Sequence, residues 1–148
     1  MTADTLTVGI AGPDDFDFWL GEWDADVGNG KSGTNTLRRV LGDAVIEEDF
    51  RSADLNGRSW SVFIPLRKVW VQTWVDDKSS YLLFTGGREP DGRRILSQRL
   101  PLGGAGPHRM VFDKITPQAF EWEWQRSDDR GDTWKLLWHI DYRRRGPA

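Results

Sequence analysis

Hydrophobic and polar positions alternate along most of the chain with a period of two. From Trp23 onward, runs rich in Val, Ile, Thr, Phe and Trp extend over roughly 6 to 11 residues, and each run is followed by residues that favour turns. Such alternation is typical of β-strands that present one apolar and one polar face. Nine turns separate ten predicted strands, and the turns are expected at residues 28–30, 42–43, 56–57, 65–67, 76–79, 90–92, 103–107, 116–118 and 127–132.

The short connections between the predicted strands determine how the strands pair. Consecutive strands joined by a few residues form antiparallel hairpins, because a parallel crossover needs a dozen residues or more. An open sheet of about ten twisted strands tends to curl, and closure removes its exposed edges. The sequence therefore predicts an all-β fold, a single antiparallel up-and-down barrel of about ten strands. Eight strands already enclose room for one small ligand, so we expect an interior cavity unless large side chains fill it.

One segment, residues 14–20, departs from this pattern and has the features of a short helix. Acidic residues occupy its first turn, and Phe16, Trp19 and Leu20 recur at helical spacing. Gly21 can then adopt the left-handed conformation that ends a helix. We therefore predict a short helix before the first strand.

No linker, low-complexity tract or internal repeat divides the sequence. A chain of this length can bury a sizeable core and fits one domain better than two. We expect a single barrel domain over residues 1–148, with a flexible N-terminus over residues 1–13 and a tail over residues 145–148.

Composition narrows the kinds of partner. The chain carries 20 Lys and Arg against 23 Asp and Glu, a formal net charge of −3, which argues against nucleic acid because phosphate binding needs a basic stripe. The one basic run, residues 143–145, is expected to be a solvated tail. The absence of cysteine excludes disulfides and cysteine metal sites. No signal-peptide pattern and no stretch approaching roughly 18 apolar residues is present, so we expect a cytoplasmic protein without a membrane partner, and we keep a homodimer open.

Tryptophan is the most informative residue type, with nine copies in the chain. Six of them fall into three evenly spaced pairs, Trp70 and Trp74, Trp122 and Trp124, and Trp134 and Trp138. Even spacing along a strand places both rings of a pair on one face, toward a packed core or a lined cavity. Tryptophan suits both, because it offers a large apolar face and one N–H donor. The predicted ligand-binding residues are Trp70, Gln72, Trp74, Trp122, Trp124, Trp138 and Tyr142.

One carboxylate, Glu48, is the candidate catalytic residue. Alternation places it on the same face as Ile46 and Phe50, where it would be desolvated. Desolvation raises the pKa of a carboxyl group toward values that suit general acid or base catalysis. The competing interpretation is a structural ion pair inside the barrel between Glu48 and Arg99 or Arg109.

The two histidines, His108 and His139, are not arranged as a metal-binding motif. We therefore predict no metal site and no cofactor. In the last strand, His139 takes the face opposite to Trp138 and Tyr142, so it should face water if the aromatic residues face the cavity. Glu121 and Glu123 alternate with two of the tryptophans and are likewise expected to be solvated.

Residues 127–134 match the pattern S-x-D-x-G-x-T-W, which resembles the Asp-box of sialidases. A propeller glycosidase would carry several copies, and this chain has one. We expect a structural turn in which Ser127 and Asp129 accept hydrogen bonds from backbone amides, Gly131 has a positive φ and Trp134 packs beneath.

Five segments together resemble a bacterial family of unknown function. They are residues 16–24 (FDFWLGEWD), 59–63 (SWSVF), 70–76 (WVQTWVD), 127–134 (SDDRGDTW) and 138–142 (WHIDY). The match covers nearly the whole chain, from about Phe16 to Arg144. That family is similar to calycin-type barrels, the class of lipocalins, fatty-acid-binding proteins and nitrobindins. The resemblance implies a barrel with a short helix closing one end, and through the nitrobindins it implies haem binding by a single histidine, although their glycine-rich signature is missing here.

Three hypotheses for function follow. The first is a barrel that binds a small, largely apolar molecule, aromatic or polycyclic, among the tryptophans. The second is a cofactor-independent enzyme, a cyclase, isomerase or dehydratase, in which Glu48 transfers a proton within the same cavity. The third is a structural or interaction protein whose interior is solid.

Overall fold

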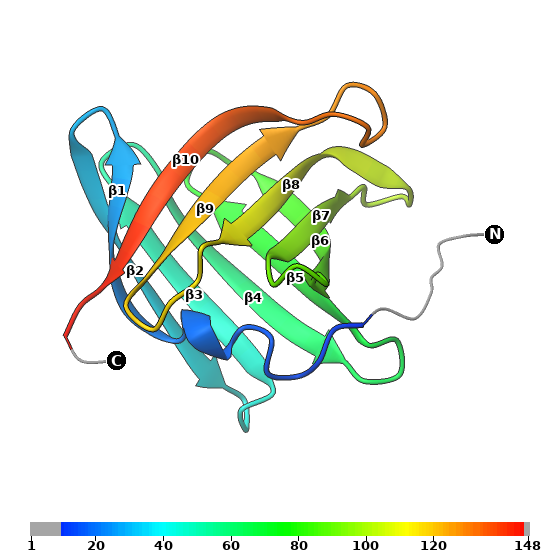
Figure 1. The fold of residues 1–148 in the computed structure, drawn as a ribbon, viewed down its shortest axis with the longest axis horizontal. Coiled ribbons are helices and arrows are strands. Elements are labelled where there is room, and N and C mark those ends of the chain that lie inside the picture. Colours follow the sequence, from blue (N-terminus) through cyan, green and yellow to red (C-terminus); the bar gives the residue numbers. More distant parts are fainter. Residues whose placement is uncertain (1–9, 147–148) are drawn as a thin grey trace.

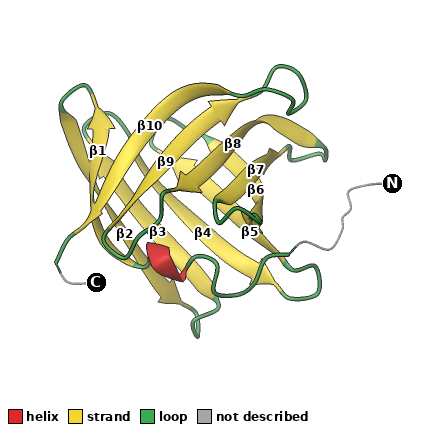
Figure 2. Cartoon of the chain, in the orientation of Figure 1, coloured by secondary structure: helices red, strands yellow, loops and turns green. Residues whose placement is uncertain are grey.

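A closed barrel of ten antiparallel strands forms the whole fold in the computed structural model, which describes residues 10–146 (Figures 1 and 2). Each strand pairs with its neighbours in sequence, and β1 pairs with β10 to close the barrel. This confirms the predicted all-β barrel. The strands are β1 (Gly21–Gly28), β2 (Lys31–Val40), β3 (Val45–Ser52), β4 (Asn56–Ile64), β5 (Val69–Asp76), β6 (Tyr81–Arg88), β7 (Arg94–Arg99), β8 (Ala105–Asp113), β9 (Ala119–Arg126) and β10 (Lys135–Arg144).

The strands run alternately toward the two ends of the barrel, so the connecting turns gather into two groups. One end, which we call the closed end, carries the segment that precedes β1 (Figure 1). The other, which we call the open end, carries the turns after β1, β3, β5, β7 and β9. Within the described residues, no helix is long and apolar enough to cross a membrane.

The predicted helix over residues 14–20 is wrong, because the segment forms only a single 3₁₀ turn, η1 (Asp17–Trp19). Its backbone bonds join residues three apart, including Trp19 N to Phe16 O at 3.1 Å. A segment this short cannot offset the cost of nucleating an α-helix, so tertiary packing decides its conformation. In a 3₁₀ turn, side chains three apart point the same way, which directs Phe16 and Trp19 together into the barrel. Both side chains are buried.

Aromatic packing fills the closed end. The Phe16 ring meets Trp70 edge to face at 5.1 Å and Phe112 at 5.4 Å. Trp23 is fully buried, and its indole Nε1 donates to the Trp19 carbonyl at 2.8 Å. The segment before β1 therefore acts as a plug, because it supplies the rings that occupy this end of the barrel.

In the basic run near the C-terminus, Arg143 and Arg145 are exposed, as predicted, whereas Arg144 is partly buried. Arg144 belongs to β10 and lies across the closed end, with its guanidinium 4.2 Å from the centre of the Trp23 ring. It donates to the carbonyls of Leu20 at 2.7 Å, Phe18 at 3.0 Å and Pro117 at 2.8 Å. Four contacts therefore fix Arg144 between the plug and the barrel wall.

The chain ends are ordered further than the predicted flexible segments suggest. Residues 1–9, most of the predicted flexible N-terminus, and residues 147–148 lie outside the described residues. Ala11 is buried, and the Gly12 carbonyl accepts a hydrogen bond from Trp70 Nε1 at 3.0 Å. At the other end, the Arg145 backbone N–H donates to the Glu22 carbonyl at 2.9 Å. The ordered fold thus begins before residue 13 and includes part of the predicted tail.

The turn between β9 and β10 has the predicted Asp-box geometry. Ser127 Oγ accepts from the Gly131 amide at 2.7 Å, and Asp129 Oδ1 accepts from the Thr133 amide at 2.8 Å. Gly131 has a φ of 94°. Hydrogen bonds from the Thr133 hydroxyl, the Thr133 amide and the Ser127 hydroxyl lower the pKa of Asp129 to about 2. This residue pattern organises a turn, as expected.

Candidate functional site

A cavity of about 240 Å³ lies inside the barrel and extends to the turns of the open end. Leu55 and Ser80, which lie in two of those turns, form part of its mouth, and Trp19 of η1 forms part of its floor. Its wall is mainly aromatic and aliphatic. The lining residues are Trp19, Glu48, Phe50, Leu55, Trp74, Asp76, Ser80, Leu82, Phe84, Met110, Trp122, Trp124, Trp138, Ile140 and Tyr142.

Three tryptophans from two neighbouring strands form one side of the cavity. Trp124 of β9 and Trp138 of β10 are register partners. Trp122 lies two residues before Trp124 on the same face of β9, closer to the closed end. The Trp122 ring lies nearly parallel to that of Trp124, with centroids 6.5 Å apart, and nearly perpendicular to that of Trp138 at 5.6 Å. Offset and perpendicular contacts are the favoured arrangements of aromatic rings, so this wall is internally packed before any ligand enters.

Trp74 lies across the cavity from this wall. Its indole Nε1 donates to Asp76 Oδ2 at 2.8 Å, and its ring lies 6.4 Å from that of Phe50. The ring also lies over Gly57 of β4, where an added Cβ would stand 2.1 Å from a Trp74 ring carbon. Gly57 therefore belongs to the site, because its missing side chain leaves the space that Trp74 occupies.

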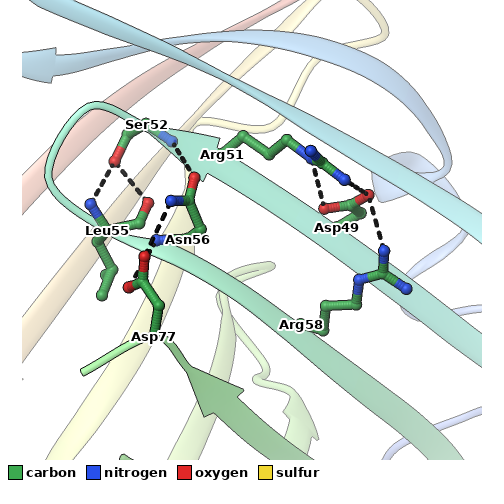
Figure 3. Close-up of polar contacts among 7 residues, drawn as sticks. All are labelled: Asp49, Arg51, Ser52, Leu55, Asn56, Arg58 and Asp77. Atoms are coloured by element: carbon green, nitrogen blue, oxygen red, sulfur yellow. Dashed lines mark hydrogen bonds and ion pairs between the residues drawn. The ribbon is translucent and has the colours of Figure 1, made fainter. Parts of the chain in front are cut away.

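The position of Gly57 corrects one predicted turn. Asn56 and Gly57 are the first residues of β4, and the turn lies before them at residues 53–55. Asn56 accepts from the Ser52 amide through Oδ1 at 3.2 Å and donates to Asp77 Oδ2 through Nδ2 at 2.9 Å (Figure 3). The side chain of Asn56 thereby ties two turns of the open end together, and one of them carries Leu55 at the cavity mouth.

Two of the predicted ligand-binding residues, Trp70 and Gln72, do not line the cavity. Strand β5 begins at the closed end, so its first inward residue, Trp70, packs against the plug, and only Trp74 reaches the cavity. Gln72 is buried between them and donates to Ser61 Oγ at 3.0 Å, while its Oε1 has no hydrogen-bond partner among residues 10–146. The other predicted ligand-binding residues, Trp74, Trp122, Trp124, Trp138 and Tyr142, all line the cavity.

The expected pairing of Trp134 with Trp138 on one face is also wrong. The register of β10 against β9 shifts between Leu136 and Trp138, so a β-bulge reverses the inward and outward positions before Trp138. Trp134 instead lies beneath the guanidinium of Arg109, 4.0 Å from the ring centre. The bulge directs Trp138 into the cavity and leaves Trp134 outside.

Glu48 is the buried acid of the cavity wall, as the alternation predicts. Its Oε1 accepts from the Ser59 hydroxyl at 2.7 Å and its Oε2 from Asn35 Nδ2 at 2.9 Å. Burial raises the pKa of the Glu48 carboxyl, while the Ser59 and Asn35 hydrogen bonds oppose that shift. Its hydrogen-bond partners are therefore neutral side chains.

The competing interpretation, an ion pair between Glu48 and Arg99 or Arg109, is wrong. Arg109 alternates with the cavity residue Met110, so it points outward, and its Nε donates to Gln125 at 2.7 Å. Arg99 follows the buried Gln98 in β7 and takes the outward face in the same way. At the closed end, Arg94 and Arg144 donate to backbone carbonyls of the plug instead, those of Asp15 and Leu20.

Asn35 and Tyr142 complete a buried polar group with Glu48. Asn35 Nδ2 lies 3.5 Å from the Tyr142 hydroxyl, and Asn35 Oδ1 has no hydrogen-bond partner in the described part of the chain. Burial raises the pKa of Tyr142 well above its ordinary value, and negative charge on Glu48 adds to the shift. Asn35 and Ser59 were not predicted as site residues, because only the register across β2, β3 and β4 brings them to Glu48.

Neither histidine lies on the cavity wall, so the cavity offers haem no imidazole ligand. His108 stacks on Trp124 at 4.7 Å, with its Nδ1 3.1 Å from Gln98 Oε1. His139 faces outward, as predicted. Although partial burial opposes the shift, hydrogen bonds to Asp141 and Glu123 raise the pKa of His139.

Among the described residues, a group of side chains on the outer face of β9 and β10 has the donor atoms to hold a metal ion. Ligand atoms of Glu121, His139 and Asp141 lie within 4.8 Å of one another. Lys114 already pairs with Glu121 at 3.5 Å, and Asp141 is largely exposed. These side chains form a solvated charge cluster on the outside of the barrel, away from the cavity.

Comparison with protein-family models and with curated proteins finds no match for this chain.

Proposed function

We propose that the barrel binds a small, largely apolar molecule of one or two aromatic rings in the cavity at its open end. The single observation that carries this proposal is the cavity itself, about 240 Å³ of space inside the barrel lined by five tryptophans. An apolar cavity of about 150 Å³ is large enough to bind benzene. Drug-sized ligands occupy about 300 to 1,000 Å³, so the space here suits a smaller molecule.

The architecture supports the same proposal. A closed ten-stranded antiparallel barrel is consistent with the calycin-type barrels that the sequence resembles. Flat ring systems gain most from contact with tryptophan faces, and the rings here already hold one another in place. A wall that is ordered before binding lowers the entropic cost of binding.

Tryptophan fluorescence tests the proposal. Toluene and naphthalene, added to the full chain, should each give a saturable change in emission. Trp122→Ala removes contact area from the wall and should weaken binding roughly tenfold. Trp60→Ala is the matched control, because Trp60 lies on the outer face and donates to Glu47 at 3.1 Å. The absence of any saturable response, or equal effects of both variants, would contradict the proposal.

A second candidate function is a cofactor-independent proton transfer by Glu48. The observation that favours it is a carboxyl group on the cavity wall whose pKa is raised by burial. In a lyase or isomerase of this kind, Glu48 would move a proton to or from a bound apolar substrate. Glu48→Gln should then preserve binding of the substrate and lower the rate by about a hundredfold or more. Equal turnover in wild type and variant would exclude this role.

A further inference from the structure

The charged side chains on the cavity wall are both acidic. They are Glu48 and Asp76, and the described lining residues include no lysine, arginine or histidine. Asp76 is already committed, since it accepts from Trp74 Nε1 at 2.8 Å, the Lys78 amide at 2.9 Å and the Ser80 amide at 3.2 Å. Glu48 is therefore the acid whose hydrogen-bonding capacity is open to a ligand.

Glu48 lacks a cationic partner among the described residues and retains unused acceptor sites. Its two hydrogen-bond donors, Ser59 and Asn35, are neutral and occupy one carboxylate oxygen each. An ionised carboxylate has about four acceptor positions, so about two remain. The same buried group contains a further acceptor, Asn35 Oδ1, to which none of the described residues donates a hydrogen bond. Glu48 and Asn35 together therefore offer several free hydrogen-bond acceptors, while the donors beside them, the Ser59 hydroxyl and Asn35 Nδ2, already bond to Glu48.

The tryptophan faces favour the same kind of ligand. The π-face of tryptophan attracts cations more strongly than those of the other aromatic side chains, and the attraction grows when water is excluded. Trp74, Trp122 and Trp138 surround the space into which Glu48 faces. An aromatic enclosure with an acid at its wall combines both forms of cation recognition.

From these contacts we infer that the ligand is a protonated amine carried on a small aromatic body, with its ammonium group at Glu48. The inference rests on the proposed binding function and specifies the chemical class of the ligand. The ammonium N–H groups supply the donors that Glu48 and Asn35 lack, and the positive charge compensates the carboxylate. The aromatic body occupies the space between the tryptophans.

Four probes of similar size test this inference by calorimetry on the full chain: benzylamine, benzyl alcohol, toluene and benzoate. A charge-assisted hydrogen bond corresponds to about a 10- to 100-fold gain in affinity. Benzylamine should bind tighter than benzyl alcohol and toluene by that factor, and benzoate should bind most weakly. Benzyl alcohol or toluene binding as tightly as benzylamine would overturn the inference while leaving the proposed function intact. Preferred binding of benzoate would also overturn it, because it would mean that Glu48 acts as a neutral donor. If none of the four binds, the proposed function itself fails.

Two glutamine variants locate the effect. Glu48→Gln should remove the advantage of benzylamine, a loss of about 10- to 100-fold, and leave toluene binding within about twofold of wild type. Glu47→Gln is the matched control, since Glu47 faces outward and pairs with Arg38 at 3.0 Å. It should leave all four affinities unchanged. Retained preference for benzylamine in a Glu48→Gln protein that still binds toluene would overturn the assignment to Glu48.

Discussion

The two ends of the barrel use the same residue type for opposite purposes. At the closed end, Trp23 and Trp70 are buried in a packed core beneath the plug. At the open end, Trp74, Trp122 and Trp138 line a cavity. Trp70 and Trp74 lie four residues apart on the same face of β5, so their spacing alone does not tell the two ends apart. The comparison teaches that a tryptophan's role is set by what covers its end of the barrel.

Hydrogen bonding does not distinguish the two ends. Trp70 Nε1 donates to the Gly12 carbonyl at 3.0 Å, and Trp138 Nε1 donates to the Val27 carbonyl at 2.9 Å. The difference lies in the segment before β1, which places Phe16 and Trp19 inside one end of the barrel. At the other end, the cavity reaches the turns that carry Leu55 and Ser80.

Truncating one tryptophan from each end should give the largest contrast. Trp23→Ala removes a fully buried ring and should lower the free energy of unfolding by about 3 to 5 kcal/mol. Trp122→Ala removes a ring that faces empty space on one side and should cost only about 1 to 2 kcal/mol. Urea unfolding of the two variants measures the difference. Equal losses would mean that the open end is packed like the closed end.

Removing the arginine that fastens the plug should have the next largest effect. Arg144→Ala loses three hydrogen bonds to carbonyls and the contact with Trp23, so we expect a loss of about 2 to 3 kcal/mol. Arg143→Ala is the matched control, because its exposed side chain should change stability by about 0.5 kcal/mol or less. Thermal unfolding of both variants checks this. A similar effect at both positions would show that Arg144 does not fasten the plug.

A methyl group added at Gly57 tests the open end by crowding a tryptophan instead of removing one. Gly57→Ala forces the Trp74 ring to move and should cost about 1 to 2 kcal/mol, with weaker toluene binding. Combining it with Trp74→Leu should abolish the added cost, because the clash partner is gone. Additive effects in this double-mutant cycle would contradict the contact between Gly57 and Trp74.

The smallest predicted effect is a pH dependence of stability from Glu48. Burial raises the folded-state pKa of Glu48 above its unfolded value, so its contribution to stability is full below the unfolded pKa and is lost as pH rises through the folded pKa. The titratable groups nearest to it are Tyr142 and Asp49. The melting temperature of Glu48→Gln relative to wild type should therefore rise as the pH is increased above 4.5. A constant difference would show that Glu48 has an unshifted pKa.

Much of this fold follows from local sequence alone. Alternation and turn residues predicted the ten strands, their antiparallel order and the inward face of Glu48, because each depends only on neighbouring residues. Trp134 was misplaced because a β-bulge shifts the alternation without a clear sequence signal. The short helix failed because tertiary packing outweighed a weak helical pattern.

The site was harder to predict, for a physical reason. Trp70 and Trp74 are indistinguishable by spacing, and only the plug makes one core and the other cavity wall. The neutral partners of Glu48 come from β2 and β4, so they could be found only once the register between strands was known. Alternation places Asn35 and Ser59 on inward faces, but it does not show that they contact Glu48.

The indole N–H resonances of the nine tryptophans test the contrast between the two ends most directly. Titration of isotope-labelled protein with toluene, with each signal assigned by a single Trp→Phe variant, reports every ring separately. We predict saturable shifts for Trp74, Trp122, Trp124 and Trp138, and little change for Trp23 and Trp70. Unchanged open-end signals, or shifts confined to the outer residues Trp60 and Trp134, would contradict a ligand site at the open end.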